Sequence, residues 1–140
     1  MLIKKRDVLR MKIPFPNLSS ELAAVPHMYI CHCIQGDKCS FVKCQTLKPY
    51  MFTNNPMRHF VDEKPDLSRN PFKYETRIDC DKDFYTEGIM YADAMRTPRR
   101  PDVCIDTMVK VEAELHTDGY ISNRIPDADV VRINELASLL

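Results

Sequence analysis

Residues 6–46 read RDVLRMKIPFPNLSSELAAVPHMYICHCIQGDKCSFVKCQT, and this stretch carries most of the information about the fold class. The apolar residues Val8, Leu9, Met11 and Ile13 alternate well enough to predict a strand over residues 7–13. Two prolines end that strand, because proline does not pair inside a sheet. Further strands are predicted over residues 27–34 and 39–46, joined by a tight turn in which Gly36 accepts a positive φ. The strand ends and the loop over residues 17–24 therefore converge on polar groups.

The rest of the chain predicts further short strands and one helix. Alternating apolar residues favour strands over residues 73–79, 89–94 and 103–113, with a turn or short helix over 81–88. Residues 48–72 are rich in proline and asparagine and longer than an ordinary connection, which predicts an irregular insertion with at most a helical turn near 55–61. Helical spacing of apolar residues, with Asp127 and Asp129 in the first turn, predicts a helix over 127–139. These elements predict a single domain over residues 1–140, mainly β, built as a small barrel with a packed C-terminal helix.

Charge and hydropathy narrow the function classes. The chain has 20 basic and 20 acidic residues, so its formal net charge is zero. Nucleic-acid binders usually have a basic excess, so any nucleic acid would have to bind to a local patch. No apolar run is long enough to span a membrane, and no apolar segment follows the basic N-terminus as it would in a secretion signal. We therefore expect a cytoplasmic protein with no membrane partner.

Six cysteines raise the question of a metal site: Cys31, Cys33, Cys39, Cys44, Cys80 and Cys104. The first four, together with His27 and His32, have the composition of a zinc site. Their spacing fits poorly, because structural zinc ligands usually come in C-x2–4-C pairs across a tight turn, whereas Cys31 and Cys33 lie along one predicted strand. We expect free thiols that pack as small apolar residues, with no metal and no cofactor.

Candidate functional residues lie at the ends of the predicted strands. His27 opens one strand and could exchange a proton near neutral pH, although a structural role is as simple a reading. Thr46 closes another strand, where its hydroxyl could hold a phosphate oxygen with Gln45 and Lys48 beside it; threonine is also a common strand former. Arg96 lies in a proline-rich loop with two further arginines that could grip phosphates or simply face solvent. No HExxH motif, GxSxG motif or glycine-rich phosphate loop is present, which leaves metal-independent chemistry or binding.

The order of motifs in residues 6–46 resembles the PemK/MazF family of toxin–antitoxin ribonucleases. Members of that family open with a Gly-Asp-Val/Ile strand, continue through a Pro-Phe-Pro or Phe-Asp-Pro loop, place Arg-Pro at the head of an apolar strand, and end a further strand near threonine. The corresponding segments here are 6–8 (RDV), 14–19 (PFPNLS), 25–26 (VP) and 45–46 (QT), and 94–97 (AMRT) looks like the segment before the last strands.

The resemblance implies an SH3-like barrel, usually a homodimer, that acts as a growth-inhibiting toxin. It implies a metal-independent endoribonuclease that cleaves single-stranded RNA by attack of a 2′-hydroxyl on phosphorus, and an acidic antitoxin protein as a partner. On this basis we expect Thr46 and His27 to be catalytic, so that Thr46→Ala and His27→Ala each abolish cleavage. We expect the substrate to be bound by Asn17, Ser19, Ser20, Gln45, Lys48 and Arg96.

One position departs from the family pattern, because Val25 stands where the family has arginine. His27 lies two residues further on, on the same face of an extended strand, and could take the place of the arginine. The alternative is a catalytically degenerate SH3-like barrel that binds protein or nucleic acid. A third reading is a CcdB-like inhibitor that acts by binding a partner protein.

Overall fold

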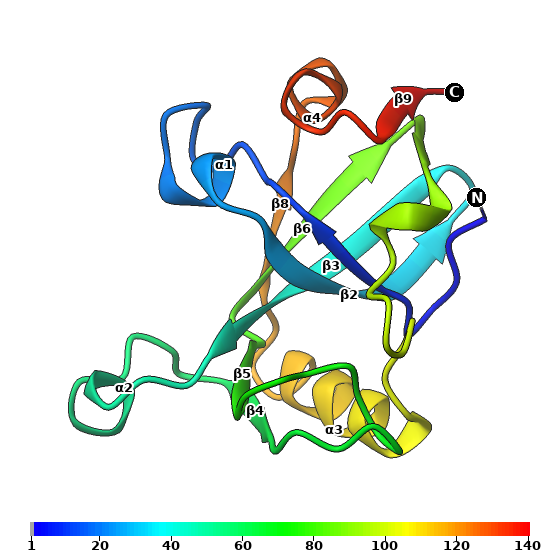
Figure 1. Ribbon diagram of the computed structural model, residues 1–140. Coiled ribbons are helices and arrows are strands. Elements are labelled where there is room, and N and C mark those ends of the chain that lie inside the picture. Colours follow the sequence, from blue (N-terminus) through cyan, green and yellow to red (C-terminus); the bar gives the residue numbers. More distant parts are fainter. Residues whose placement is uncertain (1) are drawn as a thin grey trace.

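Figure 1 shows a computed structural model of the chain, in which residues 2–140 are described. The strands are β1 (Val8–Met11), β2 (His27–Gln35), β3 (Lys38–Thr46), β4 (Phe60–Glu63), β5 (Thr76–Asp79), β6 (Lys82–Glu87), β7 (Ile89–Tyr91), β8 (Ile121–Arg124) and β9 (Ala137–Leu139). The helices are α1 (Glu21–Ala24), α2 (Tyr50–Thr53), α3 (Ile105–Leu115) and α4 (Asp127–Ile133), with a 3-10 turn η1 (Asp93–Met95). The prediction of a mainly β protein is confirmed. Over residues 2–140, no helix has the length and hydropathy needed to cross a membrane.

Strands β1, β2 and β3 pair in antiparallel order with β1 at the edge of the sheet, and in the tight turn between β2 and β3 Gly36 has a φ of 63°. Two different partners share β3: residues 38–41 pair with β6, and residues 44–46 pair with β5. Outside these, β4 pairs with β5 and β8 runs parallel to β6, while β7 and β9 form a separate pair. Within residues 2–140 no pairing joins β1 to β4, so the sheet is not closed into a barrel.

Strands β1, β2 and β3 carry buried apolar residues on both faces. Alternate residues of β1, β2 and β3 project to opposite sides of the sheet, and each side has its own apolar cluster. One cluster joins Val8, Ile30 and Val42 to Val111 and Leu115 of α3. The other joins Leu9, Tyr29 and Phe41 to Val130 of α4 and Ala137 of β9. In Figure 1, α3 accordingly lies beside β4 and β5, whereas α4 and β9 lie at the opposite end of the molecule.

The predicted strand over residues 103–113 is wrong, because this segment forms helix α3. Val109 and Val111 alternate as in a strand, but only Val111 is buried, whereas Val109 is 59% exposed. Burial of Met108, Val111 and Leu115 follows the helical spacing of three and four residues. The alternation was therefore a by-product of an amphipathic helix.

Three other boundaries also differ from the sequence prediction. The C-terminal helix stops at Ile133, well short of residue 139, and the chain then extends into β9 against β7. Residues 82–87, predicted as a turn or short helix, form strand β6. Within residues 48–72 the helical turn falls at α2 rather than at 55–61, and strand β4 pairs with β5. Strands β4, β6 and β9 each form against a partner strand elsewhere in the chain, which their local sequence does not reveal.

Candidate functional site

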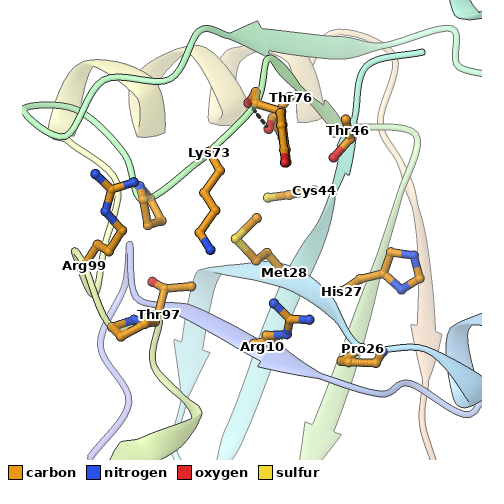
Figure 2. A pocket seen from close by; sticks show the side chains of 13 residues that line it. Arg10, Pro26, His27, Met28, Cys44, Thr46, Lys73, Thr76, Thr97 and Arg99 are labelled. Atoms are coloured by element: carbon orange, nitrogen blue, oxygen red, sulfur yellow. Dashed lines mark hydrogen bonds between the residues drawn. The ribbon is translucent and has the colours of Figure 1, made fainter.

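A pocket of about 280 Å³ opens where the last residues of β3 meet β1, the start of β2 and two loops. Figure 2 shows its side chains. They are Arg10 on β1, Pro26, His27 and Met28 around the start of β2, Cys44 and Thr46 on β3, Pro71, Lys73, Tyr74 and Thr76 from the segment leading into β5, and Thr97, Pro98 and Arg99 from the loop after η1. Pockets for small ligands usually measure about 300–1,000 Å³, so this one suits a single small group.

The register of the strands explains the floor of this pocket. Met28 pairs with Arg10 on one side and with Cys44 on the other. Residues that pair directly across antiparallel strands project to the same face, and Thr46, two residues beyond Cys44, shares that face. The floor is therefore apolar, formed by Met28 and Cys44, and the polar ends of Arg10 and Thr46 lie around it.

Three cations line the pocket: Arg10, Lys73 and Arg99 (Figure 2). All three are exposed, and within residues 2–140 none of them forms an ion pair. No aspartate or glutamate is among the lining residues. Cations without a nearby carboxylate leave a local positive potential in a chain whose formal net charge is zero. The pocket is therefore suited to an anion.

Threonine hydroxyls add hydrogen-bonding capacity at the same place. The Thr76 hydroxyl donates to the carbonyl oxygen of Tyr74 at 2.8 Å, and the Thr97 hydroxyl donates to the carbonyl oxygen of Arg100 at 2.5 Å. Their donors are thus engaged, although each hydroxyl oxygen can still accept. Thr46 is exposed and its hydroxyl has no hydrogen-bond partner among residues 2–140, so it can donate to an anion.

The loop that carries Lys73 is held by a buried polar network. The carboxylate of Glu63, 5% exposed, accepts hydrogen bonds from Thr107 at 2.7 Å, Arg69 at 3.2 Å and Asn70 at 3.3 Å. Burial alone would raise the pKa of Glu63, but these hydrogen bonds hold it below its usual value. Asn70 also accepts from the backbone N–H of Phe72, the residue before Lys73. The wall of the pocket is thereby tied to α3.

The loop that carries Arg99 is held by the arginines on either side of it. Arg96 pairs with the buried Asp7 at 2.8 Å, and Arg100 pairs with Asp102 at 2.9 Å. Arg100 also donates to the carbonyl oxygen of Leu67 at 3.0 Å, which joins the two loops that form the pocket walls. Among these three arginines, Arg99 alone lines the pocket.

His27 borders the pocket, but its ring projects away from Thr46. Met28 and Thr46 share one face of the paired strands, so the neighbouring His27 projects to the other face. Figure 2 shows the ring turned away from the space between Lys73 and Arg10. Its Nδ1–H donates to the carbonyl oxygen of Val25 at 3.0 Å. Burial and the neighbouring charge of Lys43 lower the pKa of His27, which favours the neutral ring at neutral pH.

The remaining predicted substrate-binding residues lie outside the lining of the pocket. Asn17 accepts hydrogen bonds from the backbone and hydroxyl of Ser19, and the Ser20 hydroxyl donates to the Asn17 carbonyl, so these three form a local turn. Gln45 accepts from Lys43 at 2.9 Å on the face opposite to Thr46, while Lys48 is exposed. Arg96 is committed to Asp7.

Two further sets of side chains could in principle be reactive: the group His32, Asp83 and Ser122, which lies outside the pocket, and Cys44 on its floor. His32, Asp83 and Ser122 form a chain in which Asp83 accepts from both neighbours, at 2.8 and 2.6 Å, so Ser122 is not next to the imidazole. Cys44 contributes to the pocket floor, but burial raises the pKa of its thiol, so it is not an activated nucleophile. Within residues 2–140, no three His, Cys, Asp or Glu side chains are placed to hold a metal ion.

Sequence reasoning missed Arg10 and Lys73. The signal for Arg10 was a charged residue between Leu9 and Met11 in a predicted strand next to the strand that contains His27. Placing Arg10 at the pocket requires knowing that it pairs with Met28, and this strand register cannot be read from the sequence. Lys73 belongs to no recognisable motif and lies at the start of a segment predicted as a strand, so the sequence did not mark it as a binding residue.

Comparisons with known proteins add no family to this geometry. The chain matches no family model, no curated protein and no solved structure.

Proposed function

We propose that this protein binds the phosphate backbone of single-stranded RNA in the pocket lined by Arg10, Lys73 and Arg99. The observation that carries the proposal is the group of three cations without ion pairs in a pocket whose lining has no carboxylate. Guanidinium and ammonium groups form charge-assisted hydrogen bonds with phosphate oxygens, and the free hydroxyl of Thr46 adds a neutral donor.

The shape of the site favours a single strand over a duplex. Tyr74 lines the pocket and is 66% exposed, so its ring can stack on a base. Bases of single-stranded RNA are free to stack on aromatic side chains, whereas those of a duplex are already stacked on one another. The apolar floor of Met28 and Cys44 can contact the sugar. One phosphate with its sugar and base is thus the natural occupant.

The binding experiment uses a fluorescently labelled single-stranded RNA and measures anisotropy. Arg10→Gln, Lys73→Gln and Arg99→Gln are each expected to weaken binding by about ten- to a hundredfold, because each removes one charge-assisted hydrogen bond worth about 1.5–3 kcal/mol. Arg124→Gln is the matched control, since Arg124 is exposed on β8 and has no ion pair among residues 2–140. Equal losses in all four variants would contradict a specific pocket.

A second candidate function is RNA cleavage, and one observation favours it. Thr46, the residue that the PemK/MazF resemblance makes catalytic, lines the same pocket as Arg10, which supplies a cation despite Val25. Attack of a 2′-hydroxyl on phosphorus builds negative charge on the phosphoryl oxygens, and fixed cations and hydroxyl donors stabilise that charge without a metal. In this proposal Arg10, rather than His27, takes the electrostatic role, and the toxin activity, the acidic antitoxin and the homodimer belong with it.

Cleavage is tested by incubating the labelled RNA with the protein in the presence of a chelator. Fragmentation that slows by about a hundredfold or more in Thr46→Val, while His27→Ala retains it, would support an endoribonuclease. Tight binding with intact RNA would support a binding protein that does not cleave. Growth arrest on expression with intact cellular RNA would favour inhibition of a partner protein.

A further inference from the structure

A second pocket, of about 510 Å³, lies next to the first one. It runs along the outer edge of β1, between that strand, η1 and the link from α4 to β9. Its polar lining comes from Arg10, Lys12, Arg132, Asn134 and Glu135. Apart from Arg10, these polar residues have no role in the function proposed above.

The two pockets share part of their lining. Arg10 and Pro26 line both. Arg10 and Pro26 therefore border both hollows, which adjoin each other at the end of β1 and the start of β2. We call the two hollows together the groove.

The second pocket is also rich in unpaired cations. Arg10, Lys12 and Arg132 line it against a single carboxylate, Glu135. Within residues 2–140 neither Lys12 nor Arg132 forms an ion pair. Across the two pockets there are five cations (Arg10, Lys12, Lys73, Arg99 and Arg132) and one acid.

The backbone beneath these cations is held in place. The Asn134 side chain accepts from the N–H of Lys12 and donates to its carbonyl oxygen, both at 2.9 Å. It also donates to the carbonyl oxygen of Val130 at 2.9 Å, which fixes the end of the helix that carries Arg132. The positions of Lys12 and Arg132 are thus coupled through one buried amide.

We propose that the second pocket binds the phosphate of the adjacent nucleotide, so that the groove takes at least two nucleotides with Arg10 between their phosphates. This rests on the proposed RNA binding by the first pocket. Two phosphates of one strand need two cationic hollows at neighbouring positions, and the shared Arg10 provides that arrangement. Tyr74 and the apolar floor favour a nucleic acid over an acidic peptide as the occupant, because a peptide carboxylate needs no stacking surface.

The test compares ligands with one, two and four phosphates by calorimetry: uridine monophosphate, a 5′-phosphorylated uridine dinucleotide and a 5′-phosphorylated uridine tetranucleotide. With the wild-type protein, affinity is expected to rise by about tenfold from the monophosphate to the tetranucleotide, as a second phosphate is neutralised. In the double variant Lys12→Gln/Arg132→Gln, this rise is expected to shrink to about twofold or less, with correct folding checked by circular dichroism. Arg124→Gln serves as the control of equal charge type.

The outcomes separate the two proposals. A rise with length that persists in the double variant overturns the second subsite and leaves the first pocket intact. No binding of any of the three ligands to the wild-type protein overturns the proposed function, and the second subsite with it. A glutamate-rich peptide that binds more tightly than the tetranucleotide, and loses that affinity in the double variant, would assign the groove to an acidic protein segment instead.

Discussion

Arg10 brings a cation to the pocket beside β2, the strand that begins shortly after Val25. It does so from the neighbouring strand, because its partner Met28 brings it to the face that also carries Thr46. The position of Thr46 at the pocket could be predicted from its place at a strand end, and the loop over residues 96–100 from its arginines. The sequence pointed to Arg96, however, which pairs with Asp7, whereas Arg99 lines the pocket. The positions of Arg10 and Lys73 could not be predicted, because they depend on the register between strands and on a loop anchored to α3.

The pKa of His27 gives a prediction for stability against pH. Burial and Lys43 lower this pKa in the folded protein below the usual value of 6.5. Above that value the ring is neutral in both states. As the pH falls below it, the unfolded chain takes up the proton first, so folding loses free energy.

We therefore expect the wild-type protein to lose more stability than His27→Gln between pH 7 and about pH 5. Urea unfolding at several pH values measures this difference, and all other titrating groups cancel in the comparison. Parallel curves for the two proteins would show that the ring has no lowered pKa.

At the scale of elements, α3 shows why local patterns misled. Residues 103–113 alternate like a strand, yet a helix of the same sequence buries Met108, Val111 and Leu115 on one side. Choosing between the two readings depends on what the segment packs against, here the Val8 side of the sheet. The strand pairs β4–β5 and β7–β9 also join segments whose partners cannot be read from either segment alone.

Two substitutions in α3 test the helix directly. Leu115→Ala is expected to lower the free energy of unfolding by about 2–5 kcal/mol, because it leaves a cavity in a fully buried site. Val109→Ala, at a position 59% exposed, is expected to change it by less than about 0.5 kcal/mol. Thermal or urea denaturation measures both, and a large loss for Val109→Ala would contradict the orientation of the helix.

At the scale of the whole molecule, apolar clusters cover both faces of the sheet, so polar side chains for binding are available mainly at the ends of its strands. The groove formed by the two pockets lies at one such end, where cations gather although the formal net charge is zero. Composition could therefore exclude a broadly basic surface but could not reveal a local one. Long-range attraction for nucleic acid is expected to be small, and affinity is expected to depend on the few phosphates inside the groove.

The salt dependence of the binding constant measures how many phosphates the protein neutralises when it binds RNA. For single strands, the logarithm of the binding constant falls with the logarithm of salt concentration by about 0.7 per neutralised phosphate, so two phosphates give a slope of about −1.4. Anisotropy titrations from low to high salt determine the slope. A slope near zero would contradict phosphate binding, and a slope steeper than about −3 would indicate a longer track than the groove offers.

The Asn134 side chain has a consequence for solubility. Its two hydrogen bonds occupy the N–H and the carbonyl of Lys12, the residue that follows the edge strand β1, as a further strand would. An open strand edge is a template on which strands of other molecules can add and aggregate. We expect Asn134→Ala to expose this edge and to increase light scattering with protein concentration and time, whereas Glu135→Ala, one residue on, should not. The Asn134 amide thus blocks the addition of further strands at this edge. It also lines the second pocket, which stays open to a ligand.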